Sequence, residues 1–267
     1  MRVRGEGARG RRAVGTMPRA GSRGAGAWRR VEEMLAGDGP VVVSLAPSYV
    51  AAFEASPGQV VAALRSLGFR VVEETASVLG EMIRRREEMA REAVPVLSGS
   101  CPVVRRLIAG EFPWLLPRVE PASAMGLHLA RLRYRYPGAR AVFLGPCEAK
   151  RLLPEPVQPD AVLTFREVAS WWYARGIDPG RCEPSVPDRT ADALARISVA
   201  VVHASGLEEC RRMLSRVSAG PWEGLPYLEI TACPGGCLNG PGMPPADAGE
   251  RRQKAVQYAM EAELCLR

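Results

Sequence analysis

The hydrophobic positions of this chain gather into seven short runs, separated by longer stretches that mix polar and apolar residues. Each run is five to eight residues long and rich in Val, Ile or Leu, which is typical of a buried β-strand. Strands that alternate with helices predict an α/β fold with mostly parallel sheets. The predicted strands span residues 41–46, 70–74, 94–98, 140–145, 160–165, 197–204 and 226–231.

Several of the intervening stretches carry helix-start signals. Ser56-Pro57, Thr164 and Gly206 each stand directly before an amphipathic segment, as N-cap positions do. Two more helices are expected, over the segment MGLHLARL and over AGERRQKAVQYAMEAEL near the C-terminus.

The proline-containing stretch PEPVQPD, residues 154–160, is the expected linker of the fold. It divides the chain into an N-terminal α/β lobe, residues 40–153, and a C-terminal α/β lobe, residues 160–267. Both lobes are expected to belong to one domain. Residues 1–30 stand apart from them as an Arg/Gly-rich leader.

The net charge of +7 is concentrated in that leader. Residues 1–30 hold nine arginines and one glutamate, a net +8, so the rest of the chain carries −1. A nearly neutral fold does not predict a surface for nucleic acid. The leader has no apolar period and is expected to be disordered.

No segment of the sequence predicts export or membrane insertion. The pair Arg11-Arg12 is not followed by an apolar stretch, which disfavours an export signal. The apolar runs are far shorter than the about 20 residues that span a bilayer. We therefore expect a cytoplasmic protein without a membrane partner.

Four of the seven cysteines share one setting. Cys101, Cys147, Cys233 and Cys237 each follow a predicted strand, and open α/β sheets bind ligands at the carboxyl ends of their strands. Four thiols in this setting predict four ligands of one metal centre. The others lack it: Cys182 lies in a loop, Cys210 in an amphipathic helix and Cys265 in the tail.

Other readings of these four cysteines remain open at this point. Unrelated buried cysteines would not explain the shared setting, and the missing export signal disfavours disulfides. A zinc site usually uses close pairs two to four residues apart, and only Cys233 and Cys237 are close. A 4Fe-4S cube accepts scattered thiolates, and Gly235 and Gly236 let the backbone approach it.

Three cysteine motifs resemble those of the iron-only, di-iron hydrogenase large-subunit domain. They read SGSCP (98–102), GPCEAK (145–150) and TACPGGCLNGPGMP (231–244), and VVVSLAPSYVAAF (41–53) is similar to the opening strand and turn of that domain. The resemblance runs from about Pro40 to the C-terminus. It implies two α/β lobes that clasp an H-cluster, a 4Fe-4S cube joined to a di-iron unit with CO and cyanide ligands.

The resemblance also implies roles for individual residues. Cys101, Cys147, Cys233 and Cys237 would hold the cube, with Cys237 as the bridge to the di-iron unit. Lys150 would hold one cyanide, and the turn of Ala46, Pro47 and Ser48 would lie beside the other.

Composition singles out Lys150 independently. Of the 36 basic residues only Lys150 and Lys254 are lysines, so this sequence places arginine wherever a cation is merely solvated. A compact ammonium fits a small anionic ligand better than a planar guanidinium does. The alternative is a surface lysine that follows a strand.

Several positions depart from the pattern of active hydrogenases. The family's proton-passing cysteine is Ser100 here, and an alcohol is a far weaker acid than a thiol with a pKa near ~8.5. A family glutamate is replaced by Leu153, and two methionines by Gly145 and Thr231. The relay carboxylates of the family fall in GEMIRRREEMA, where Glu81 is retained and Arg84–Arg86 are interpreted as a solvated helix face.

These observations favour an H-cluster protein that senses H2, or slowly and reversibly oxidises it, as an anaerobic oxidoreductase with an impaired proton relay. Its partners would be H2, hydrogenase maturation proteins and an external electron carrier such as a ferredoxin. One alternative is a 4Fe-4S-only protein for electron transfer or iron-sulfur assembly. The other is a zinc-stabilised interaction module.

Other chemistry-bearing residues are interpreted as structural. His128 and His203 are lone histidines, which are more often packed or surface groups than ligands. Trp171, Trp172 and Tyr173 are expected to pack in the core and between the lobes.

Overall fold

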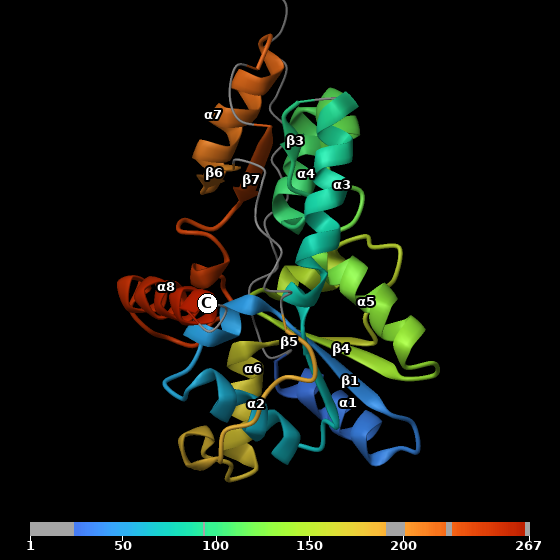
Figure 1. Ribbon diagram of the computed structural model, residues 1–267, viewed down its shortest axis with the longest axis vertical. Helices are drawn as coiled ribbons and strands as arrows, with labels where there is room; N and C mark the ends of the chain where they lie inside the picture. The colour runs from blue at the N-terminus through green and yellow to red at the C-terminus, as the bar shows by residue number, and fades with distance from the viewer. Residues whose placement is uncertain (1–23, 93, 191–200, 223–225, 265–267) are drawn as a thin grey trace, which may run out of the picture.

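The computed structural model describes residues 24–92, 94–190, 201–222 and 226–264. Two sheets lie toward opposite ends of an elongated molecule (Figure 1). The larger sheet has the order β2 (Val71–Glu74), β1 (Val41–Leu45), β4 (Arg140–Gly145), β5 (Ala161–Thr164). The smaller sheet has the order β3 (Val96–Leu97), β7 (Tyr227–Thr231), β6 (Val201–Ser205). Every strand pair in both sheets is parallel, which confirms the predicted fold class.

All seven strands form where the hydrophobic runs predict them. The run at 94–98 yields only the two-residue strand β3, and β6 extends one residue beyond its predicted end. Residues 197–200, the first part of the run predicted for β6, lie outside the described residues.

The two sheets draw strands from both sides of the expected linker. β3 precedes residues 154–160 in sequence but pairs with β7, in the smaller sheet. β5 follows the linker but pairs with β4, in the larger sheet. The chain therefore passes between the sheets more than once, and strand pairing does not follow the order of the segments along the sequence.

Helices cover the faces of both sheets. Their bounds are α1 (Gly24–Ala36), α2 (Pro57–Ser66), α3 (Leu79–Glu92), α4 (Pro102–Glu111), α5 (Ala124–Arg135), α6 (Phe165–Ala174), α7 (Leu207–Ser218) and α8 (Ala248–Leu264). The start signals of α2, α6 and α7 are confirmed. Ser56 and Thr164 both form capping boxes, in which the side chains of Gln59 and Glu167 accept hydrogen bonds from the backbone N–H groups of Ser56 and Thr164.

The expectation of a disordered leader is wrong for residues 24–30, which form the first turns of α1. The physical reason is a tertiary contact: the Trp28 ring stacks on Trp171 at 5.9 Å, and Val31 is fully buried. This burial offsets the cost of ordering a sequence with low helix propensity. Residues 1–23 lie outside the described residues.

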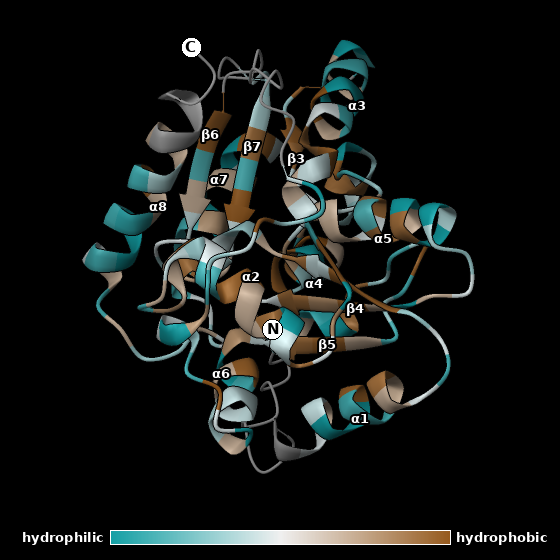
Figure 2. Ribbon diagram, turned by 60° about the horizontal axis from the view of Figure 1, so that its bottom comes forward, coloured by the Kyte–Doolittle hydropathy of each residue, from teal (hydrophilic) through white to brown (hydrophobic). Residues whose placement is uncertain are grey.

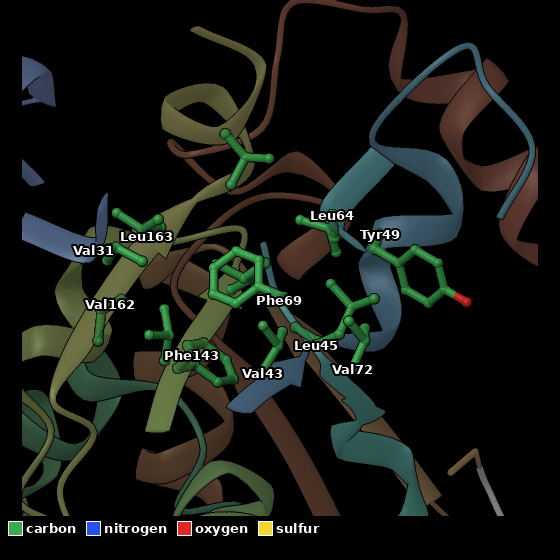
Figure 3. Packing of buried hydrophobic residues seen from close by; sticks show 14 of the residues in the cluster. Val31, Val43, Leu45, Tyr49, Leu64, Phe69, Val72, Phe143, Val162 and Leu163 are labelled. Carbon is green, nitrogen blue, oxygen red and sulfur yellow. The ribbon is translucent and has the colours of Figure 1, made fainter. Parts of the chain in front are cut away.

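Apolar side chains from β1, β4, β5 and their covering helices form the main core (Figure 3). A second core lies under the smaller sheet and includes Leu97, Ile108, Leu214 and Leu228. Figure 2 shows β4 and β5 as mostly hydrophobic, whereas α8 is mostly hydrophilic. Within the described part of the chain, no helix combines the length and apolar character needed to cross a membrane.

Candidate metal centre

Two of the four predicted ligand cysteines lie directly at helix starts. Cys101 follows β3 and is the N-cap residue of α4, where Pro102 occupies the first helical position. Cys147 follows β4 and is the N-cap residue of the 3-10 helix η4 (Glu148–Leu152). Neither side chain forms a capping hydrogen bond, although the Ala149 backbone partly opposes the rise in the Cys147 pKa.

The other two cysteines belong to a loop after β7 whose backbone requires glycine. Gly235 and Gly236 have φ values of 75° and 78°, in the left-handed region that disfavours other residues. A Cβ on Gly235 would meet Asn239 Nδ2 at 2.4 Å. The tight turn brings Cys233 and Cys237 onto the same short loop.

This loop docks on the residue before Cys147. The Gly242 N–H donates to the Pro146 carbonyl at 2.7 Å, and a Cβ on Gly240 would meet that same oxygen at 2.5 Å. The glycines of the third motif therefore fix the position of Cys237 relative to the second motif.

Cys101 lies close enough to Cys147, Cys233 and Cys237 to raise the pKa of each of their thiols. Burial, together with the nearby Cys147 and Cys101, raises the pKa of Cys233 to about 11. The Cys237 residue is exposed as a whole, but protein atoms surround its sulfur. This burial raises the pKa of the Cys237 thiol to about 12, and the positive charge of Lys150 opposes the rise. Burial also raises the pKa of Cys147, which Cys101 raises too.

Four thiols are a ligand set for either a zinc ion or an iron-sulfur cluster. Among the described residues, no three His, Cys, Asp or Glu side chains are close enough to hold a single ion. A tetrahedral zinc site has Zn–S distances of about 2.3 Å, so its sulfurs nearly touch.

Lys150 is buried beside the cysteines, so the alternative of a surface lysine is wrong. Its ammonium donates to the Ser100 carbonyl at 2.5 Å, next to Cys101 in sequence, and its charge acts on Cys237. No carboxylate in the described part of the chain forms an ion pair with it. A buried cation without a counter-ion favours an anionic ligand at this position.

The turn after β1 also reaches the centre. Ala46 is buried, Ser48 is half-buried and Pro47 is exposed at the start of η1 (Pro47–Ala51). η1 contacts η6 (Cys237–Asn239), which begins with the predicted bridging cysteine. The contact of η1 with η6 and the hydrogen bond from Lys150 to Ser100 therefore place the turn after β1, Lys150 and the cysteine motifs near one another.

Three of the positions that depart from the family pattern, Ser100, Gly145 and Leu153, are buried or half-buried. Leu153 is buried in the main core. A Cβ on Gly145 would meet the Phe143 ring at 2.5 Å, so packing requires glycine. Ser100 is half-buried, and its backbone N–H donates to Ser98 Oγ at 3.3 Å.

The sequence did not predict a polar network of Ser98, Glu120, Tyr227 and Glu229. The Tyr227 hydroxyl lies 2.9 Å from Glu120 Oε2 and 3.0 Å from Glu229 Oε2, and Ser98 donates to Glu229 at 2.9 Å. Burial raises the pKa of Glu120, and the nearby Glu229 adds to this effect. Tyr227 and Glu229 are two residues apart along β7 and therefore lie on one face of the strand, and this spacing could have predicted the network from the sequence.

The interpretation of Arg84–Arg86 as a solvated face is wrong for Arg86. Its guanidinium donates to Glu120 at 2.8 Å and stacks over the Tyr227 ring at 3.9 Å. The buried carboxylate of Glu120 draws this arginine inward. Glu81 is engaged on the other side of α3, in ion pairs with Arg85 and Arg131.

The remaining interpretations can be checked directly. His128 is fully buried between Ser44 and Glu73, and His203 is an exposed residue of β6, so both are packed or surface groups as expected. Cys210 is buried in α7. Trp171 and Trp172 lie in the core, whereas Tyr173 is exposed and was wrongly assigned to packing.

The family comparison agrees with the three cysteine motifs. The family model for the iron-only hydrogenase large subunit, C-terminal domain, matches residues 39–198 and 188–241. This chain belongs to that family. The resemblance seen in the sequence is confirmed, although no curated protein matches the chain.

Solved FeFe-hydrogenases share the fold. An apo HydA1 variant from Chlamydomonas reinhardtii is 18% identical, with a TM-score of 0.70 over 86% of this chain and 88% of that one. A HydA structure that describes stepwise H-cluster assembly is 17% identical, with a TM-score of 0.66 over the same shares. At these identities the likeness concerns the fold, which is the predicted iron-only hydrogenase-like architecture.

Proposed function

We propose that this protein binds an H-cluster and uses it to sense H2 or to oxidise it slowly and reversibly. Its main support is that thiols from three distant segments affect one another's pKa values beside the buried ammonium of Lys150, which has no ion pair with a carboxylate of the described residues. When bound, the cluster would supply the redox centre at which H2 and protons interconvert.

The residues present fit such a group. Cys101, Cys147, Cys233 and Cys237 would hold the 4Fe-4S cube through their thiolates. Lys150 would complement an anionic cyanide ligand, and the turn at residues 46–48 would line the other side.

Ser100 limits the chemistry that the protein's own groups can supply. Its hydroxyl occupies the position of the family's proton-passing thiol but is a much weaker acid at neutral pH. Slow proton delivery suits a sensor better than a fast enzyme. Electrons would come from a separate carrier such as a ferredoxin, and maturation proteins would deliver the di-iron unit.

Anaerobic maturation followed by iron analysis and infrared spectroscopy tests the proposal. We expect about six irons per chain, the sum of a 4Fe and a 2Fe unit, together with CO and cyanide bands that shift under H2. A cube without those bands would instead support the alternative, a 4Fe-4S-only electron-transfer or assembly protein. Stoichiometric zinc without iron would overturn both.

Lys150→Met is the most selective variant for this test. We expect it to retain the cube but to lose at least about 90% of the infrared bands, since the buried cation for the cyanide ligand is gone. The neighbouring Arg151→Met is the control, because Arg151 is exposed and pairs with Glu167. Equal band intensities in both variants would refute the role of Lys150.

A further inference from the structure

A mostly buried cluster of two carboxyls, one phenol and one guanidinium links α3 to the smaller sheet. Glu120 precedes α5, Tyr227 and Glu229 belong to β7, and Arg86 reaches them from α3. The Arg86 guanidinium donates to Glu120 Oε1 at 2.8 Å and lies 4.0 Å from Glu229 Oε2. In the described part of the chain, no other cation forms an ion pair with either carboxyl. One negative charge is therefore uncompensated unless one carboxyl carries a proton.

The contacts of the Tyr227 hydroxyl require that proton. The phenol oxygen lies 2.9 Å from Glu120 Oε2 and 3.0 Å from Glu229 Oε2, which are both hydrogen-bond distances. A phenol has one proton to donate, and an ionised carboxylate can only accept. Both contacts are hydrogen bonds only when one carboxyl is protonated and donates to the phenol oxygen. Burial, with the charge of Glu229, raises the pKa of Glu120, which agrees with a retained proton.

Glu120 is the end of this cluster that reaches the surface. The residue is 4% exposed and lines a cavity of about 210 Å³ between α3 and α5. The other charged residues of the cavity are Arg85, Glu88 and Glu92, all from α3. Arg85 is paired with Glu81, and Glu88 and Glu92 are exposed. The cavity therefore gives Glu120 a route for proton exchange with solvent.

Glu229 is the end that acts on the candidate metal centre. Its side chain is 27% exposed. Burial is the main cause that raises the pKa of Cys237, and the negative charge of Glu229 adds to it. Ser98 donates to Glu229 Oε1 at 2.9 Å and accepts the Ser100 N–H at 3.3 Å, within the first cysteine motif. Negative charge added at the cysteines would therefore raise the proton affinity of Glu229.

We propose that Glu120, Tyr227 and Glu229 form a proton-transfer unit, which holds one proton and passes it between the cavity beside α3 and the candidate metal centre. In the transfer, the Glu120 Oε2–H bond breaks as its proton binds the phenol oxygen, and the phenol proton moves to Glu229 Oε2. The phenol is neutral before and after. The negative charge moves from Glu229 to Glu120, where the Arg86 guanidinium stabilises it.

The shared proton is independent of the proposed function, whereas delivery of the proton to a cluster rests on it. After the transfer, Glu229 gives its proton to the centre, and solvent in the cavity reprotonates Glu120. The route does not use the Ser100 hydroxyl. A buried phenol is a much weaker acid than a thiol, so transfer through Tyr227 is consistent with slow turnover.

Infrared spectroscopy of the iron-free, full-length chain tests the shared proton. At pH 7 we expect the carbonyl band of a protonated carboxyl, which shifts in D2O. Glu120→Gln and Glu229→Gln should each abolish it, because the remaining carboxyl ionises beside Arg86. Glu88→Gln is the control, since Glu88 lines the same cavity but is exposed, and it should leave the band unchanged.

Two results of this experiment would overturn the proposal. The first is the absence of such a band from the parent protein. The second is a band that survives in Glu229→Gln, because burial alone would then protonate Glu120 and the two carboxyls would not share the proton.

Tyr227→Phe tests the transfer without altering either carboxyl. We expect the loaded protein to keep its iron and its CO and cyanide bands, but to form HD from D2 in H2O at least about tenfold more slowly. Tyr136→Phe is the matched control, because the Tyr136 hydroxyl also donates to a buried carboxylate, Glu73, at 2.9 Å. It should change the rate by less than twofold. Equal rates in the two variants would overturn the transfer.

The two readouts separate this inference from the proposed function. Absence of CO and cyanide bands from every loaded sample would overturn the H-cluster and the delivery of protons to it. The iron-free protein would still decide whether Glu120 and Glu229 share a proton.

Discussion

Glu73 is a buried carboxylate in β2 that three groups keep ionised. His128 Nε2 lies 3.3 Å from it, Arg135 donates to it at 2.6 Å and the Tyr136 hydroxyl donates at 2.9 Å. Burial opposes ionisation, but the hydrogen bonds from His128, Arg135 and Tyr136 outweigh it and lower the Glu73 pKa to about 2. The residue therefore ties α5 to the larger sheet.

This shift predicts an acid-dependent contribution to stability. Because the folded pKa is below the unfolded value of 4.5, the contribution is present above about pH 4.5 and is lost as pH falls toward 2. Glu73→Gln should cost about 3 kcal/mol of unfolding free energy at pH 7, and this cost should shrink between pH 5 and pH 2. Urea unfolding across this pH range measures the effect.

Glu88→Gln is the control for that measurement, because Glu88 is exposed on α3. It should change the unfolding free energy by less than about 0.5 kcal/mol at every pH. If the difference in unfolding free energy between Glu73→Gln and the parent stays constant from pH 5 to pH 2, the result contradicts the role of the ionised carboxylate.

At the scale of elements, the loop after β7 depends on close backbone contact with the end of β4. Gly240→Ala should displace the loop, because the added Cβ would meet the Pro146 carbonyl at 2.5 Å. We expect iron retained after anaerobic reconstitution to fall by more than about half, since the loop carries two of the four proposed cube ligands.

Gly110→Ala is the matched control within α4. Nothing lies within 4 Å of a Cβ added there, so the variant should keep its iron and gain about 0.5–1 kcal/mol of stability from helix propensity. If both glycine variants retain the same amount of iron, the loop does not need this close approach.

At the scale of the whole molecule, the proposed ligands join the two sheets. Cys147 follows β4 of the larger sheet, whereas Cys101, Cys233 and Cys237 follow strands of the smaller one. A bound cluster would therefore link both sheets and stabilise the folded state, which alone presents all four thiols together.

Iron-loaded protein should accordingly melt at least about 5 °C above the iron-free form, given that 1 kcal/mol moves Tm by about 2–4 °C at this size. Cys147→Ser should abolish the difference, and Cys182→Ser, a change in the loop that ends η5 (Pro179–Arg181), should preserve it. Anaerobic thermal unfolding gives the comparison. Loss of the difference in Cys182→Ser as well would indicate nonspecific iron binding.

Local patterns were sufficient for much of this fold and of the candidate site. The seven strands, the capping boxes at Ser56 and Thr164 and the four cysteines at strand ends all follow from residues close together in sequence. Hydrophobic periodicity and capping act over a few residues, so the sequence by itself determined the elements, the family and the cysteines expected at the centre.

Only the tertiary structure decided which elements meet. β3 pairs with β7 across more than a hundred residues, Trp28 orders α1 by stacking on Trp171, and Arg86 turns inward to Glu120. It also buries Lys150 and Arg251 without carboxylate partners among the described residues. These outcomes depend on burial and charge in three dimensions, because each partner lies in a distant segment whose position no local pattern specifies.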